Sequence, residues 1–315
     1  MGRQAEIFLR QASYCDPRSA LYGGLCRRLA TDPRVAALAP DLRWDFPLRL
    51  LGGLHALVLA GRASWDDVDA ALDEHADELA RFAAEHGVQT NEVQRAWALL
   101  PGLLALGAER VDIVEIGASA GLLLALDAYG YRYRAGTWGS GDERLVLSGD
   151  DAGGPPVDLL ACRLRVERRR GVDREPIALD DAGARLLEAF VWPDQPDRIE
   201  RLRRAIEIAR GCEIAVERGD YVARLPALLA DRREDVPTVV VSSVTTTYLP
   251  EERYHDLRAV LAHAGAEGPL AWLSLESPRG DPGYGGLALD LTTWPDGGSR
   301  RLAQVDYHAS WLRWL

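Results

Sequence analysis

The sequence predicts a mixed α/β fold, a Rossmann-like doubly wound sheet, on three observations. Residues 111–116 and 238–241 are short β-branched runs with the composition of strands buried in a parallel sheet. A glycine-rich turn and a helical segment follow the first run directly, which is the opening of a nucleotide-binding unit. After an interruption at residues 137–190, helical and strand patterns alternate again.

The composition is that of a globular protein and argues against several classes. Of 315 residues, 47% are apolar, yet no run of about 18 apolar residues predicts a membrane span. The first ten residues lack the apolar core of a signal peptide, so we expect a cytoplasmic protein. The formal net charge of −11 disfavours binding to nucleic acid. The four cysteines form no CxxC pair, so we expect no metal site, and the oligomeric state stays open.

Residues 1–108 are expected to form a helical layer in front of the sheet. Val68, Leu72, Leu79 and Phe82 recur at helical spacing, and a second helix is expected over about 91–106. No convincing strand pattern occurs before residue 111. We therefore predict a helical N-terminal region, 1–108, and a Rossmann-like domain, 109–315.

The second domain is expected to contain an insertion and to end in a hairpin. Residues 131–133 have the pattern of a second strand, and 137–190 are interpreted as an insertion. Within it, apolar residues alternate with charged ones over 160–167, which predicts a half-exposed antiparallel strand. At the end of the chain, residues 286–291 and 302–307 flank a Pro-Asp-Gly-Gly turn, which predicts an antiparallel hairpin.

The main functional signal is the turn Gly117-Ala118-Ser119-Ala120-Gly121, which follows Glu115. Glycines allow a ligand to approach the backbone, and amides at the start of a helix bind anionic groups. Glu115, at the end of its strand, is suited to an ammonium or hydroxyl group. These features suit S-adenosylmethionine and, roughly, a dinucleotide, although a tight turn without a ligand has the same pattern. The residues expected to bind the cofactor are Glu115, Gly117, Ala118, Ser119 and Gly121.

Asp220 follows the strand expected over 214–216 and has two interpretations. At the carboxyl end of a strand, its carboxylate can accept a hydrogen bond from an adenine amine. It also immediately precedes a helix, where aspartate is a favoured N-cap. One aspartate can do both.

The same glycine turn also spells Gly-x-Ser-x-Gly, the nucleophile elbow of α/β-hydrolases. An acid such as Asp290 or Asp296 and then His308 follow Ser119 in the order that this fold requires. However, such a hydrolase needs several strands and an oxyanion loop before the elbow, and the first 110 residues have a helical pattern. A serine hydrolase is therefore the weaker interpretation.

Other polar residues have the types and positions expected of a site. Asn91, Glu92 and Arg95 begin a helix before the first strand, where they serve either as caps or as groups lying over the turn. Glu92 and His308 are candidate bases, and Tyr248 is a further catalytic candidate. Asn91, Arg95, Arg170, Asp173 and Ser242 are the candidate substrate contacts. Arg170 ends a run of three arginines, which is also typical of a solvated face.

Several longer motifs carry a resemblance to a known family. They include residues 89–95, the run 114–122, Arg170-Gly171-Val172-Asp173, residues 191–195, and the closing His308 with Trp311 and Trp314. The chain resembles, over nearly its whole length, a bacterial family called domain of unknown function 2332. That family usually has His-Gly near its end, whereas Ala309 follows His308 here.

The family is similar to the class I S-adenosylmethionine-dependent methyltransferases. This resemblance implies a sheet of seven strands, six of them parallel, and methyl transfer to an acceptor, for which we expect a small molecule. It also implies an acid at the end of the second strand, roughly 20 residues past the glycine turn, to hold the ribose. The first acid there is Asp142. Its distance from the expected strand, together with Ser119 in place of a glycine, keeps open a non-catalytic or regulatory binding protein on a degenerate fold.

Overall fold

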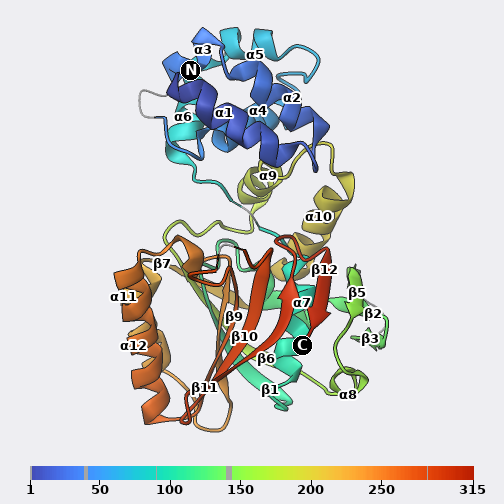
Figure 1. Cartoon of the computed structure of the whole chain (residues 1–315), viewed down its shortest axis with the longest axis vertical. Helices are drawn as coiled ribbons and strands as arrows, with labels where there is room; N and C mark the ends of the chain where they lie inside the picture. Colours follow the sequence, from blue (N-terminus) through green and yellow to red (C-terminus); the bar gives the residue numbers. More distant parts are fainter. Residues whose placement is uncertain (1, 39–41, 90, 140–143, 282) are drawn as a thin grey trace. The chain divides into compact units, whose positions relative to one another are not determined.

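The chain folds into two compact units in the computed structural model, which describes residues 2–38, 42–89, 91–139, 144–281 and 283–315 (Figure 1). One unit is helical and comprises residues up to 91 together with 178–203. The other contains the β-sheets and comprises residues 92–177 and 204–315. The chain thus returns to the helical unit from within the segment that we had expected to be an insertion.

The helical unit is built around α4, which is apolar on most of its surface. Phe8, Leu50, Leu51 and Leu54 are almost completely buried in its core. The imidazole Nδ1 of His55 lies 3.2 Å from the carbonyl oxygen of Ala189, which ties α4 to α9. The helices of this unit are α1 (Arg3–Cys15), α2 (Ala20–Leu29), α3 (Pro33–Leu38), α4 (Phe46–Leu59), α5 (Val68–Glu74), α6 (Ala76–Glu85) and α9 (Asp181–Ala189), and α10 (Pro196–Arg210) continues into the other unit.

The central sheet has nine strands in the described part of the chain, in the order β5-β12-β11-β10-β9-β8-β1-β6-β7. Strands β7, β6, β1, β8 and β9 run parallel, while β10, β11 and β12 continue the sheet in antiparallel pairings. The doubly wound, mostly parallel sheet and the terminal β10–β11 hairpin are therefore confirmed. The bounds are β1 (Arg110–Ile116), β5 (Asp150–Gly153), β6 (Arg165–Asp173), β7 (Ile214–Arg218), β8 (Thr238–Ser243), β9 (Leu270–Glu276), β10 (Leu287–Trp294), β11 (Gly298–Val305) and β12 (Trp311–Trp314).

The second strand of this sheet is β6, and our prediction that residues 131–133 form it is wrong. Strand β6 pairs in parallel with β1, so that Ile116 lies opposite Val172. Our prediction of an antiparallel strand over 160–167 is also wrong, because β6, which begins at Arg165, pairs in parallel with β1. Residues 131–133 lie in β2 (Gly130–Tyr133), which forms a separate small sheet with β3 (Gly136–Trp138) and β4 (Val146–Ser148).

Helices cover both faces of the central sheet. Strand β1 directs Val114 and Ile116 into a core shared with α11 (Tyr221–Ala230) and α12 (Glu251–Glu267), which lie together in Figure 1. On the opposite face lie α7 (Arg95–Leu104) and the 3₁₀ helix η1 (Leu122–Ala128). Gly102 of α7 packs directly on leucines of β9 and β10, so α7 belongs to the sheet unit. The remaining short helices are α8 (Val157–Leu160) and the 3₁₀ helix η2 (Thr246–Tyr248).

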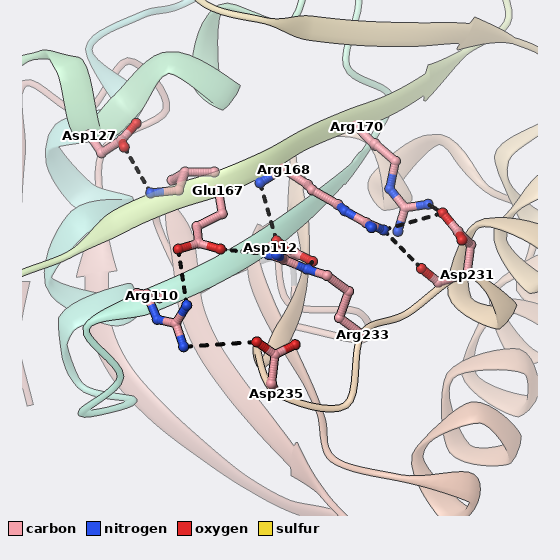
Figure 2. A network of polar contacts seen from close by, with 10 residues as sticks. Arg110, Asp112, Asp127, Glu167, Arg168, Arg170, Asp231, Arg233 and Asp235 are labelled. Atoms are coloured by element: carbon pink, nitrogen blue, oxygen red, sulfur yellow. Dashed lines mark hydrogen bonds and ion pairs between the residues drawn. The ribbon is translucent and has the colours of Figure 1, made fainter.

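A buried ion network joins β1 and β6 near their amino ends (Figure 2). Asp112 is completely buried and accepts hydrogen bonds at 2.6 and 2.9 Å from the guanidinium of Arg233. It also accepts the backbone N–H of Arg168 at 3.1 Å. Glu167 of β6 binds the same Arg233 at 2.9 Å. The network therefore fixes the register of β6 beside β1 and holds the segment that leads into β8.

Replacing Asp112 by alanine is expected to lower the free energy of unfolding clearly more than a surface substitution does, because it removes the buried carboxylate that binds Arg233 and the backbone N–H of Arg168. The control is Asp235→Ala, since Asp235 is 69% exposed and only 4.0 Å from Arg110. That variant should change stability by less than about 0.5 kcal/mol. Urea unfolding followed by circular dichroism measures both. Equal losses in the two variants would show that the network does not stabilise the sheet.

Candidate functional site

Acidic side chains stand at or just after the carboxyl ends of neighbouring parallel strands. Glu115 is the penultimate residue of β1, Asp173 ends β6, and Asp220 lies two residues after β7. Glu276 ends β9. Because these strands are parallel, their carboxyl ends lie along one edge of the sheet, which is where ligands bind in open α/β sheets. This edge is the candidate site.

Glu115 is the most unusual group at this edge. Glu115 is only 3% exposed, and its Oε2 has no hydrogen-bond partner among the residues that the structure describes. Burial raises the pKa of Glu115 well above its usual range, and the nearby carboxylate of Asp173 raises it further. Burying a carboxyl group without a partner is costly, so such a group is typical of a site that receives a ligand.

Asp173 fixes the glycine turn against the end of β6. Its Oδ2 accepts the backbone N–H of Ser119 at 2.8 Å, and its Oδ1 accepts that of Glu175 at 2.9 Å. Since β6 neighbours β1, Asp173 is the acid that ends the second strand of the sheet. Asp142, the first acid noted after the turn in the sequence, lies outside the described residues.

The glycine turn is shaped by packing against neighbouring segments. Gly117 has φ +70°, and a Cβ there would lie 2.4 Å from Oγ1 of Thr245, in the loop after β8. Gly121 has φ +72°, and a Cβ there would lie 2.8 Å from the side chain of Ile214. The left-handed conformation and the close contact both require glycine at these positions.

We expected the amides of the glycine turn to bind an anionic group, but they are hydrogen-bonded within the protein. The N–H groups of Gly117 and Ala118 donate to the carbonyl of Val172 at 2.8 and 3.3 Å, and that of Gly121 donates to Ala118. The N–H of Ser119 donates to Asp173. These amides are satisfied within the protein, and a short 3₁₀ helix follows them, so the side chains of Glu115 and Asp173 carry the site's polarity.

Glu276 holds the loop that faces the glycine turn, and our sequence reasoning missed it. Its carboxylate accepts the backbone N–H groups of Thr245, Thr246 and Thr247 at 3.0–3.2 Å. Burial raises the pKa of Glu276, and these N–H groups oppose the shift. Val244, just before the loop, has φ +52°, which is strained for a β-branched residue. An acid ending a buried strand, the pattern of Glu115, was the signal that could have identified Glu276.

Asp220 caps α11 and is also bound by two arginines. Its Oδ1 accepts the backbone N–H of Ala223 at 3.1 Å, as the N-cap interpretation expects. The same oxygen accepts from Arg253 at 2.7 Å, and Oδ2 accepts from Arg174 at 3.1 Å. An adenine amine would therefore share this carboxylate with two guanidinium groups.

The structure brings together the two base candidates, which lie far apart in the sequence. Nδ1 of His308 lies 3.3 Å from Oε2 of Glu92, and Glu92 is 5% exposed. Arg95 donates from Nε to the carbonyl of Tyr307 at 3.1 Å. Ala309 has φ +54°, a conformation that favours the glycine usual in the family at this position.

The remaining candidates lie in different surroundings, and Ser242 is opposite Ile116, near the end of β8 next to the turn. Arg170 forms an ion pair at 2.9 Å with Asp231, which follows α11 and belongs to the surroundings of the buried network in Figure 2. Ser242 is buried and accepts from the indole of Trp272 at 3.2 Å, while Tyr248 is 66% exposed on η2. Asn91 belongs to the helical unit.

Two observations on the described residues disfavour a serine hydrolase. His308 contacts Glu92, which precedes Ser119 in the chain, and Asp290 is held by Arg301 at 2.9 and 3.1 Å. No strand precedes β1 in residues 2–38, 42–89 and 91–109. The φ of Ser119, +50°, resembles that of a nucleophile elbow.

Comparison with known proteins identifies a family. A bacterial family described as "Uncharacterized protein conserved in bacteria (DUF2332)" matches residues 5–314, nearly the whole chain. The chain belongs to the DUF2332 family. No curated protein matches it. In the described ranges, this DUF2332 protein has no cluster of three or more potential metal ligands, and none of its helices combines the length and apolarity that crossing a membrane requires.

A matched pair of glycine variants tests how the turn is constrained. Gly107 has φ +69° with open space around its Cα, so Gly107→Ala should cost only the backbone strain, about 1 kcal/mol. Gly117→Ala adds a clash with Thr245 and should cost about 1–3 kcal/mol more. Urea unfolding of the two variants measures the difference. Equal destabilisation would show that the loop after β8 does not press on the turn.

The pH dependence of stability tests the burial of Glu115. Its folded-state pKa is raised, so the unfolded chain loses the proton first, and folding becomes less favourable as pH rises above the unfolded pKa of about 4.5. Glu115→Gln should therefore gain stability relative to the native protein as pH increases from 4.5, by at most about 1.4 kcal/mol per pH unit. Denaturant unfolding from pH 4.5 to 8 measures this gain. A constant difference, like that expected for the exposed control Glu252→Gln, would contradict it.

Proposed function

We propose that this DUF2332 protein binds S-adenosylmethionine and transfers its methyl group to a small-molecule acceptor. The observation that carries the proposal is the buried, unpaired carboxyl oxygen of Glu115 beside Asp173 at the carboxyl edge of β1 and β6. S-adenosylmethionine presents an ammonium group and ribose hydroxyls, and carboxylates are suited to accept hydrogen bonds from both.

The strand order supports the same location. From β1 the chain continues to β6 and β7 on one side, and then to β8 and β9 on the other. The sheet therefore changes direction between β1 and β8, and ligands of doubly wound sheets bind outside such a switch point. The two segments there are the glycine turn, 117–121, and the loop after β8.

The order of the acids also supports the proposal. Glu115, Asp173 and Asp220 stand at or after the ends of the first, second and third parallel strands from β1 outward. The resemblance to class I methyltransferases implies an acid at the end of the second strand for the ribose, and the position of Asp220 after its strand suits an adenine amine. Because Asp173 ends β6, the neighbour of β1 on this side, it would supply the acid that the sequence alone had left missing.

Each residue would have a distinct role. Glu115 would accept a hydrogen bond from the ammonium group, whose positive charge would offset the cost of ionising a buried carboxyl. Asp173 would accept from ribose hydroxyls with the lone pairs that its two backbone contacts leave. When bound, the cofactor supplies a methyl group on a sulfonium, and the protein contributes mainly alignment of that group with the acceptor.

A binding or regulatory protein without catalysis is the second candidate. It is favoured by the turn amides of Gly117, Ala118 and Ser119, which are occupied within the protein, and by the two arginines on Asp220. These features reduce the groups available to the cofactor. Cofactor binding without turnover on any acceptor would be the behaviour of this second candidate.

Calorimetric titration with S-adenosylmethionine and S-adenosylhomocysteine tests the proposal. We expect saturable binding that weakens about 10- to 100-fold in Glu115→Gln and in Asp173→Asn, since each loses a charge-assisted hydrogen bond of about 1.5–3 kcal/mol. The matched control, Asp235→Asn, removes a charge from an exposed site at the amino edge and should bind normally. No binding by the native protein at millimolar ligand would refute the methyltransferase assignment.

A further inference from the structure

Glu92 and His308 form an acid–imidazole pair that the cofactor contacts above do not use. Oε2 of Glu92 lies 3.3 Å from Nδ1 of His308. Glu92 is 5% exposed, and both ring nitrogens of His308 are shielded from solvent. Nε2, on the far side of the ring, has no hydrogen-bond partner within the described ranges. Nε2 is therefore the ring atom of His308 that we consider for a ligand.

The backbone around His308 is held from several directions. Oδ2 of Asp306 accepts the N–H of His308 at 3.1 Å and the hydroxyl of Ser310 at 2.8 Å. Gln94 donates to the carbonyl of Ala309 at 3.4 Å, next to the carbonyl bound by Arg95. Ala309 is fixed at φ +54°, a strained conformation that costs about 1–2 kcal/mol. Strain that the surroundings maintain in this way is concentrated at functional positions.

The pair lies at the same edge of the sheet as the candidate cofactor site. Strand β10 is antiparallel to β9, and Ala288 of β10 lies opposite both Glu276 and Gln304. The end of β11, and the loop with His308 that follows it, therefore lie beside the carboxyl end of β9. The hydroxyl of Tyr307 also lies 3.0 Å from that of Ser277, which follows Glu276.

We propose that Glu92 and His308 are the proton-accepting pair of the acceptor site, and that the acceptor presents an O–H or N–H group to Nε2 of His308. This inference rests on the proposed function. A proton on Nδ1 would lie beside the Glu92 carboxylate, 3.3 Å away, and Nε2 would then carry a lone pair that accepts a hydrogen bond. A carboxylate acceptor has no proton to present there, so the geometry selects an alcohol, phenol or amine.

The proposed methyl transfer accounts for each bond formed or broken and for the proton released. The acceptor oxygen or nitrogen attacks the methyl carbon, and a new O–C or N–C bond forms while the carbon–sulfur bond breaks with its electron pair left on sulfur. The acceptor proton passes to Nε2. The imidazolium that results is stabilised by the carboxylate of Glu92, and the products are the methylated acceptor and a thioether.

The tautomer of His308 gives the first test, and it needs no cofactor. Nitrogen-15 NMR of the six histidine rings distinguishes Nδ1–H from Nε2–H. At pH 8 we expect His308 to carry its proton on Nδ1, and Glu92→Leu to lose that preference. His255 and His263 are internal controls, since each is 70% exposed or more and lies 3.2–3.5 Å from a helical glutamate through Nε2. A proton on Nε2 of His308, or an unchanged tautomer in Glu92→Leu, overturns the proposal.

Matched fragments on the native protein give the second test, which does not depend on a variant that folds. Phenol and aniline carry a donor, whereas anisole and N,N-dimethylaniline are their methylated counterparts without one. We expect millimolar phenol or aniline to shift the Nε2 resonance of His308, and the methylated compounds to shift it much less. Equal shifts within the pairs, or none, overturn the proposal. Calorimetry with S-adenosylhomocysteine separately tests the proposed function, so a failure of either assignment can be recognised.

Discussion

The placement of β6 between β1 and β7 is the constraint on which the rest of the sheet unit depends. This strand carries consecutive arginines into the middle of a parallel sheet, and each guanidinium has to meet a carboxylate there. Arg169 is paired with Asp127 of η1, whereas Arg168 and Arg170 share Asp231. Those pairs fix η1 on one side and the end of α11 on the other. Only with β6 in this position do Asp173 and the glycine turn meet.

Apolar strands could be predicted from the sequence, and charged or aromatic ones could not. Residues 111–116 and 238–241 are mostly β-branched and apolar, so composition alone identified β1 and β8. Strand β6 is rich in charged residues, and the carboxylates that bind them lie on segments distant in the sequence. A short stretch of sequence therefore could not identify this strand. Conversely, Tyr131 and Tyr133 resemble a sheet strand, but their hydroxyls donate to carbonyls of η1 and α7 and hold a separate small sheet in place.

The same contrast between local and long-range features applies to the candidate site. Glu115 and the glycine turn are contiguous in the sequence and were found there. The pairing of Glu92 with His308, and the clamp of Glu276 on residues 245–247, join segments that are separated by long stretches of chain. The use of the turn amides also depends on a neighbour, because Val172 of β6 accepts two of them. Residue types therefore identified candidates, while the sheet order decided which of them meet.

The two buried acidic side chains of β1, Asp112 and Glu115, differ in whether a cationic side chain binds them. At the amino edge, the buried carboxylate of Asp112 is neutralised by Arg233, as a stable fold requires. At the carboxyl edge, Glu115 is buried without such a partner, Val244 and Ala309 have strained backbones, and Nε2 of His308 has no acceptor or donor in the described residues. Each of these features lowers stability, and each lies at the edge where the proposed ligand would bind. Such costs are typical of ligand-binding sites, and they fit the site proposed above for a cation and a hydrogen-bond donor.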